Sequence, residues 1–109
     1  MTKIDTAEKL REIYGMPMEL AVAKALTKLD PHCRHFIELA PFAVISSADA
    51  KGNADVSPRG DGPGFIKVLD DNTLLMPDRP GNNRVDTLSN IIENPNVGML
   101  FFVPGFNDT

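Results

Sequence analysis

The sequence predicts a mainly β domain with helices at its N-terminal end, built as a small β-barrel or a curled antiparallel sheet. Two observations carry this prediction. Apolar residues recur at helical spacing up to residue 40, and after Pro41 they fall into short strand-like runs separated by Gly, Pro, Asn and Asp. One further helical segment interrupts these runs.

Three helices are expected in the N-terminal part. Thr6 is suited to cap the first and Gly15 to stop it, while Asp30 and Pro31 supply an N-cap and a first-turn proline for the third. Pro41 ends the third helix. The expected helices cover residues 6–14, 17–29 and 31–39.

The strands come next, with a hairpin loop over residues 48–53. Pro58 is expected to end the ladder pairing of the second strand after Ser57, because proline has no N–H to donate. The expected strands cover residues 42–47, 55–57, 65–69, 73–76 and 97–103, and a helix over residues 85–93 precedes the last of them.

Composition limits the class of protein. The chain has 109 residues, 42% of them hydrophobic, and a net charge of −4. This length suits one domain, the acidic balance disfavours nucleic-acid binding, and no apolar run approaches the ~20 residues of a membrane span. A lone Cys33 excludes a disulfide framework. We therefore expect a soluble, cytoplasmic protein.

The first segment with potential chemistry covers residues 55–65, DVSPRGDGPGF. Ser57 and Arg59 offer a hydroxyl and a guanidinium group, which together suit a phosphate, and the glycines let the backbone approach a ligand. The alternative is a glycine-rich turn in which Arg59 pairs with Asp61.

The second segment covers residues 76–84, MPDRPGNNR. It leaves a strand and enters the N-terminus of a helix, where free backbone N–H groups favour an anion. The alternative is that Asn82 or Asn83 only caps the helix while Arg79 and Arg84 face solvent.

No catalytic residue or metal site is evident elsewhere. His32 and His35 share a helix with Cys33, but the two histidines lack a third ligand, so a surface or partner-packing role is favoured. Walker A, GxGxxG and GxSxG motifs are absent.

Taken in order, these segments resemble the FMN-binding split-barrel proteins related to pyridoxamine 5′-phosphate oxidase. The resemblance covers most of residues 30–105. Within this family, the sequence is most similar to the flavin-nucleotide-binding subgroup and less similar to the oxidase itself. The motifs that carry it are FAVISS followed by DAKG, SPRGDGPGF, TLLMPDRPGNNR, and the helix to Asn94-Pro95 with the strand after it.

The resemblance implies one FMN-binding split-barrel domain over residues 1–109, with a helical extension (1–40) and a six-stranded barrel with an inserted helix (41–109). It also implies a homodimer with FMN in a cleft at the interface. Arg84 and Asn83 would bind the FMN phosphate, while Ser57, Pro58 and Arg59 would line the flavin. Pro77, Asp78 and Arg79 would meet the ring or the ribityl chain.

One departure concerns the C-terminal strands. Similar chains continue after Pro104-Gly105 with strands that close the barrel, whereas this sequence ends at Thr109. An incomplete barrel is expected, with residues 97–103 as an edge that pairs with another chain. Weakened or lost flavin binding would be a consequence of the missing strands.

Three functions follow from this reading. The first is an FMN-dependent oxidoreductase acting on an unidentified small molecule, where the cofactor carries the redox chemistry. The second is a flavin-binding or storage module without turnover, since no general acid or base is evident. The third is a dimeric scaffold without flavin. The residues do not distinguish FMN from the deazaflavin that relatives of this fold use.

Overall fold

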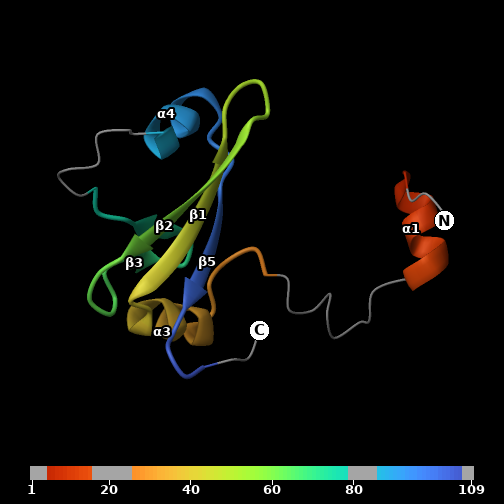
Figure 1. Cartoon of the computed structure of the whole chain (residues 1–109). Coiled ribbons are helices and arrows are strands. Elements are labelled where there is room, and N and C mark those ends of the chain that lie inside the picture. Colours follow the sequence, from red (N-terminus) through yellow and green to blue (C-terminus); the bar gives the residue numbers. More distant parts are fainter. Residues whose placement is uncertain (1–4, 16–25, 79–85, 107–109) are drawn as a thin grey trace.

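A computed structural model describes residues 5–15, 26–78 and 86–106 of the chain. The predicted site residues Arg79, Asn83 and Arg84, and most of the predicted second helix, lie outside these ranges. The described elements are α1 (Ala7–Tyr14), α3 (Pro31–Leu39), β1 (Phe42–Ala48), β2 (Ala54–Gly60), β3 (Lys67–Asp70), β4 (Thr73–Leu75), α4 (Asp86–Glu93) and β5 (Gly98–Phe102) (Figure 1).

Two of the expected N-terminal helices are confirmed, together with their caps. Thr6 accepts a hydrogen bond from the Lys9 amide at 3.1 Å, and α1 ends at Gly15, whose φ is +71°. The Asp30 carboxylate accepts from the Cys33 amide at 2.8 Å at the start of α3, with Pro31 in its first turn. These boundaries depend on neighbouring residues only, which is why the sequence predicts them.

The prediction that the second helix extends to residue 29 is wrong. Residues 26–29 lie outside any helix. The Leu29 amide donates instead to the Asp71 carbonyl at 2.8 Å, so this stretch is tied to the turn between β3 and β4. A tertiary hydrogen bond has overridden the helical spacing of its apolar residues.

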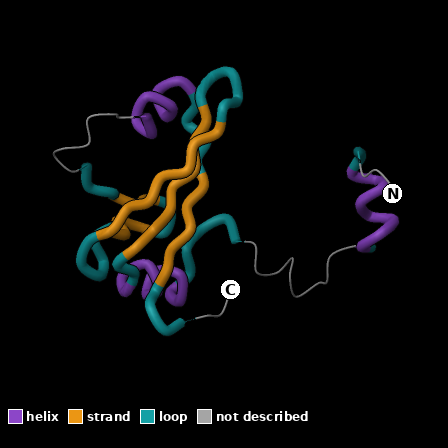
Figure 2. Tube along the Cα trace, viewed as in Figure 1, coloured by secondary structure: helices purple, strands orange, loops and turns teal. Residues whose placement is uncertain are grey.

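The strands form two separate antiparallel sheets (Figure 2). The larger has the order β2-β1-β5 and the smaller pairs β3 with β4. The prediction of a split barrel is therefore met only in its mixture of helices and antiparallel strands, because no closed barrel is present among the described residues.

The second strand is longer than predicted. β2 continues through Pro58 to Gly60, and Pro58 lies opposite Val44 in the ladder with β1. The expectation that Pro58 ends the pairing is wrong because β2 is an edge strand. At the edge of a sheet, the N–H that proline lacks would point to solvent, so its absence costs the ladder no hydrogen bond.

The core lies on one face of the larger sheet, here called the inner face. Ala43, Ile45 and Ser47 of β1 are buried on it. Ala43 packs with Ile37 of α3 and with Ile66, and this cluster is surrounded by partly buried side chains. These are Leu29, Phe65, Val68, Leu74, Met76, Met99 and Phe101.

The helices of the described ranges are short. None has the length and apolar character that crossing a membrane requires.

Gly64 is the position where the fold depends most on a glycine. Its φ is +73°, and a Cβ built on it would lie 2.7 Å from the Glu38 carbonyl oxygen. Its amide donates to the Ala40 carbonyl at 3.1 Å. The loop after β2 therefore lies directly against the C-terminal end of α3.

We expect Gly64→Ala to lower the free energy of unfolding by about 1–3 kcal/mol, because the alanine is strained at positive φ and meets a backbone oxygen. Gly62→Ala is the matched control, since nothing lies within 4 Å of its Cβ. Urea unfolding followed by circular dichroism measures both variants. Equal midpoints for the two would contradict the packing described for Gly64.

Candidate functional site

An open cleft of about 650 Å³ lies between the loop after β2 and the end of β4. It brings together parts of the two segments that the sequence singles out. Its lining residues are Asp61, Gly62, Pro63, Gly64, Phe65, Lys67, Leu75, Met76, Pro77 and Asp78.

Backbone hydrogen bonds fix the loop wall of the cleft. The Asp61 amide donates to the Pro41 carbonyl at 3.0 Å, and Gly64 makes its bond to Ala40 nearby. Within the loop, the Phe65 amide donates to the Gly62 carbonyl at 3.1 Å. The loop is thus held at both ends to the junction between α3 and β1.

The opposite wall comes from the smaller sheet. Leu75 pairs with Lys67 across β3 and β4, and both residues line the cleft. Met76 follows directly and also packs against the core cluster. Pro77 is half-buried and Asp78 is exposed. This wall therefore rests on the core through Met76.

The lining is mostly apolar, with charge at a few points. Phe65, Leu75 and Met76 supply apolar surface, and the charged lining residues are Lys67, Asp61 and Asp78. A surface of this composition, with few convergent polar groups, is typical of small-molecule sites.

The predicted site residues divide into separate groups. Pro77 and Asp78 line the cleft, as a ligand role requires. Ser57 and Arg59 lie on the inner face of the sheet, where they are half-buried, and Arg59 Nη1 donates to Ser57 Oγ at 3.0 Å. Pro58 is exposed on the opposite face. The role of these residues toward a ligand stays a prediction.

Sequence reasoning missed two residues of the cleft, Lys67 and Leu75, which it predicts only as strand residues. Met76 belongs to the second segment that the sequence singles out. The cross-strand pairing of Lys67 with Leu75 is the geometric reason that they share the site. The turn Asp70-Asp71-Asn72 joins the two predicted strands and indicates their pairing from the sequence, but not that the pair lines a cleft.

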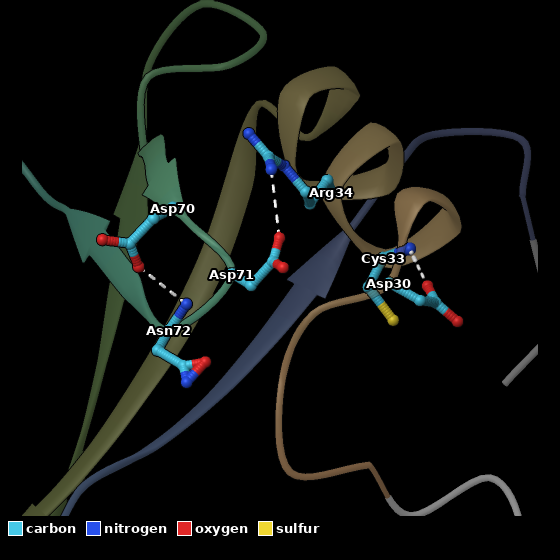
Figure 3. A network of polar contacts seen from close by, with 6 residues as sticks. All are labelled: Asp30, Cys33, Arg34, Asp70, Asp71 and Asn72. Carbon is cyan, nitrogen blue, oxygen red and sulfur yellow. Dashed lines mark hydrogen bonds and ion pairs between the residues drawn. The ribbon is translucent and has the colours of Figure 1, made fainter.

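A second cavity, of about 430 Å³, lies beside the N-terminal half of α3. Figure 3 shows the polar contacts near it: Arg34 pairs with Asp71 at 3.1 Å, and Asp70 accepts from the Asn72 amide at 2.8 Å. The side chain of Asp30 and burial both raise the pKa of the Cys33 thiol. A raised pKa disfavours the thiolate form that a nucleophilic cysteine requires.

Metal binding finds no support in the described ranges. They contain no group of three His, Cys, Asp or Glu side chains placed to hold an ion. His32 and His35 are both exposed on α3.

The comparison with protein families finds a match over most of the chain. The model of the family described as pyridoxamine 5′-phosphate oxidase matches residues 29–107. The chain belongs to the pyridoxamine 5′-phosphate oxidase family. The match to this family includes both walls of the cleft and every described element except α1. No curated protein and no solved structure gives a significant match to the chain.

The N-cap of α3 gives the protein a testable pH dependence. Hydrogen bonding from the Cys33 amide holds the pKa of Asp30 below its ordinary value of 3.8. The carboxylate therefore stabilises the fold above the unfolded pKa, and this contribution is lost as the pH falls through the lower, folded pKa.

We expect Asp30→Asn to keep a capping side chain but to lack this titration. Its urea midpoint should lie below that of the wild type at pH 7, and the difference between the two midpoints should narrow as the pH falls below 3.8. Asp30→Ala, which removes the cap, should be less stable than Asp30→Asn both at pH 7 and at pH 3. A gap that is constant between pH 7 and pH 3 would contradict the assigned pKa direction.

Proposed function

We propose that this chain is an FMN-binding flavoprotein and an oxidoreductase that acts on a small molecule. One observation supports it most: the cleft joins the loop Asp61–Phe65 to Pro77 and Asp78, and these are parts of the two motifs that carry the resemblance to flavin-binding relatives. Membership of the family, from the match over residues 29–107, supports the same proposal.

The size and chemistry of the cleft are consistent with a flavin. Its volume of about 650 Å³ lies within the roughly 300–1,000 Å³ that is usual for ligand pockets. Phe65, Leu75 and Met76 offer an apolar surface for an aromatic ring system, and the backbone around Gly62 and Gly64 allows a ligand to approach closely. Deazaflavin has the same shape requirements, so direct binding measurements separate the two.

The proposed roles follow the chain. Pro77 and Asp78, with Arg79, hold the ring or the ribityl chain. Ser57, Pro58 and Arg59 are proposed to line the flavin from β2, where Ser57 and Arg59 face inward, Pro58 faces outward, and none of the three belongs to the lining of the cleft itself. Asn83 and Arg84 hold the phosphate before α4. A bound flavin supplies the redox chemistry, while the chain binds and orients it.

The position of α4 is fixed by contacts to the first hairpin. Asn90 Nδ2 donates to Ser47 Oγ at 3.1 Å, and Glu93 Oε2 accepts from the Ala50 amide at 3.0 Å. Thr87 is buried, with 3% of its surface exposed. A helix held in this way would give the proposed phosphate-binding segment a defined end point.

Leu75→Glu is expected to weaken flavin binding at least about tenfold, because a carboxylate replaces apolar surface inside the cleft. Leu69→Glu is a matched control. Leu69 belongs to the same strand pair and is exposed to a similar degree, 59% against 55% for Leu75, but it does not line the cleft. Quenching of flavin fluorescence measures both affinities, and equal losses in the two variants would argue against this cleft.

Arg84→Ala is expected to raise the Kd for FMN about tenfold or more while leaving riboflavin binding unchanged, because only FMN carries the phosphate. Arg11→Ala, on the exposed surface of α1, serves as the charge-matched control. If Arg84→Ala binds FMN as tightly as the wild type, the phosphate assignment is wrong.

Reduction of the bound flavin by a nicotinamide donor separates an oxidoreductase from a storage module without turnover.

A further inference from the structure

The step from Asp61 to Gly62 combines a reactive sequence with an open position on the loop wall of the cleft. No other aspartate or asparagine of the chain is followed by glycine. Both residues are exposed, and nothing lies within 4 Å of a Cβ built on Gly62. The amide nitrogen of the residue after an aspartate can attack the aspartyl carboxyl group, and glycine, which has no Cβ, hinders this attack least.

The side chain of Asp61 is already turned toward that nitrogen. The Gly62 amide donates a hydrogen bond to Asp61 Oδ1 at 2.8 Å. Because Oδ1 is bonded to Cγ, the rotamer that makes this hydrogen bond also brings the Gly62 nitrogen close to the carbon that it would attack. Reacting atoms that are held close together react faster than atoms that must first meet. The five-membered ring therefore needs little further rotation to close.

We propose that the bond between Asp61 and Gly62 is a site of spontaneous isomerisation, at which aspartate is converted through a cyclic imide into isoaspartate. The Gly62 nitrogen attacks Cγ of the neutral carboxyl group. The N–Cγ bond forms, the Cγ–OH bond breaks, and the hydroxyl leaves with the amide proton as water. Water then opens the ring. Breaking the N–Cγ bond restores aspartate, whereas breaking the bond from nitrogen to the main-chain carbonyl carbon gives isoaspartate, whose backbone runs through Cβ and Cγ.

Asp49 shows why the sequence and the geometry both matter. It also lies in a connecting loop, but its Oδ1 accepts from the amides of Lys51 and Asn53, two and four residues further on. The Ala50 amide, which would have to attack, donates instead to Glu93 Oε2 at 3.0 Å. Hydrogen bonding from Asn53 also holds the pKa of Asp49 below its ordinary value, which keeps this carboxyl group ionised and less open to attack.

Isomerisation would reshape the loop wall of the cleft, because the modified segment is anchored on both sides. The Asp61 amide is bonded to the Pro41 carbonyl, and the Gly64 amide to the Ala40 carbonyl. Isoaspartate adds one carbon to the backbone between these two anchors. Since Asp61, Gly62 and Gly64 line the cleft, aged molecules have a different cleft from new ones. The reaction needs no flavin, so it does not depend on the proposed function.

Isoaspartate in the full chain, measured after prolonged incubation at neutral pH and physiological temperature, provides the first test. Enzymatic methylation of isoaspartate followed by peptide mapping locates the modified residue. We expect isoaspartate to accumulate at Asp61 in the wild type and at least about tenfold more slowly in Gly62→Ala, because the added methyl group crowds the forming ring. This alanine fits the open space around Gly62, and circular dichroism checks that the variant is folded. If Asp61 gains no more isoaspartate than the other aspartates do, the proposal is wrong.

Ala50→Gly separates the effect of geometry from that of sequence. It creates a second Asp-Gly step, after Asp49, at an exposed position whose amide is bonded to Glu93. In the folded protein we expect Asp49 of this variant to isomerise at least about tenfold more slowly than Asp61. In concentrated urea, where neither hydrogen bond is present, we expect similar rates. Equal rates in the folded protein would overturn the role given to the hydrogen bond between Gly62 and Asp61.

The isomerised fraction, separated from unmodified protein by chromatography, tests the effect on the loop wall. We expect its urea midpoint to lie below that of the unmodified fraction, because the longer backbone strains the two anchoring hydrogen bonds at Pro41 and Ala40. An unchanged midpoint would overturn the predicted change in the loop wall.

Discussion

The central position of β1 is the constraint on which the rest of the described structure depends. It pairs with β2 on one side and β5 on the other, and its alternate residues decide which side of the sheet is buried. Ala43 is fully buried, because its small side chain lets Ile37 and Ile66 pack closely against the sheet. Ser47 lies on the same face of β1, four residues after Ala43, and its Oγ accepts the hydrogen bond from Asn90 Nδ2. The core and the position of α4 thus both follow from one strand.

The cleft is a consequence of how β1 begins. The chain leaves α3 at Ala40 and Pro41, and the carbonyls of these two residues hold the loop after β2. Gly64 can accept this position because it lacks the Cβ that would meet Glu38. The other wall is supported by Met76 on the core. Both walls therefore rest on packed elements, which is the arrangement that a preorganised binding site requires.

Local signals in the sequence predict the ends of individual elements, whereas features that depend on long-range pairing are not predicted. Thr6, Gly15, Asp30 and Pro31 act on neighbouring backbone groups, so the sequence alone identifies the ends of α1 and α3. The fate of Pro58 depends on whether its strand lies at an edge, which no local pattern reveals. The cleft could be predicted only as two separate segments, because their meeting depends on the pairing of β3 with β4.

The alternation of β2 separates two kinds of residue that the sequence placed in one motif. Ser57 and Arg59 face inward, while Val56 and Pro58 face outward. A slip of the β1–β2 register by one residue would exchange the two sets. It would expose a guanidinium group on the face that points away from the core and bring a proline and a valine to the inner one. Hydrogen bonding between Asp49 and Asn53 in the connecting loop opposes such a slip, since it fixes the loop at one length. The hairpin loop therefore contributes to deciding which side chains each face of the sheet presents.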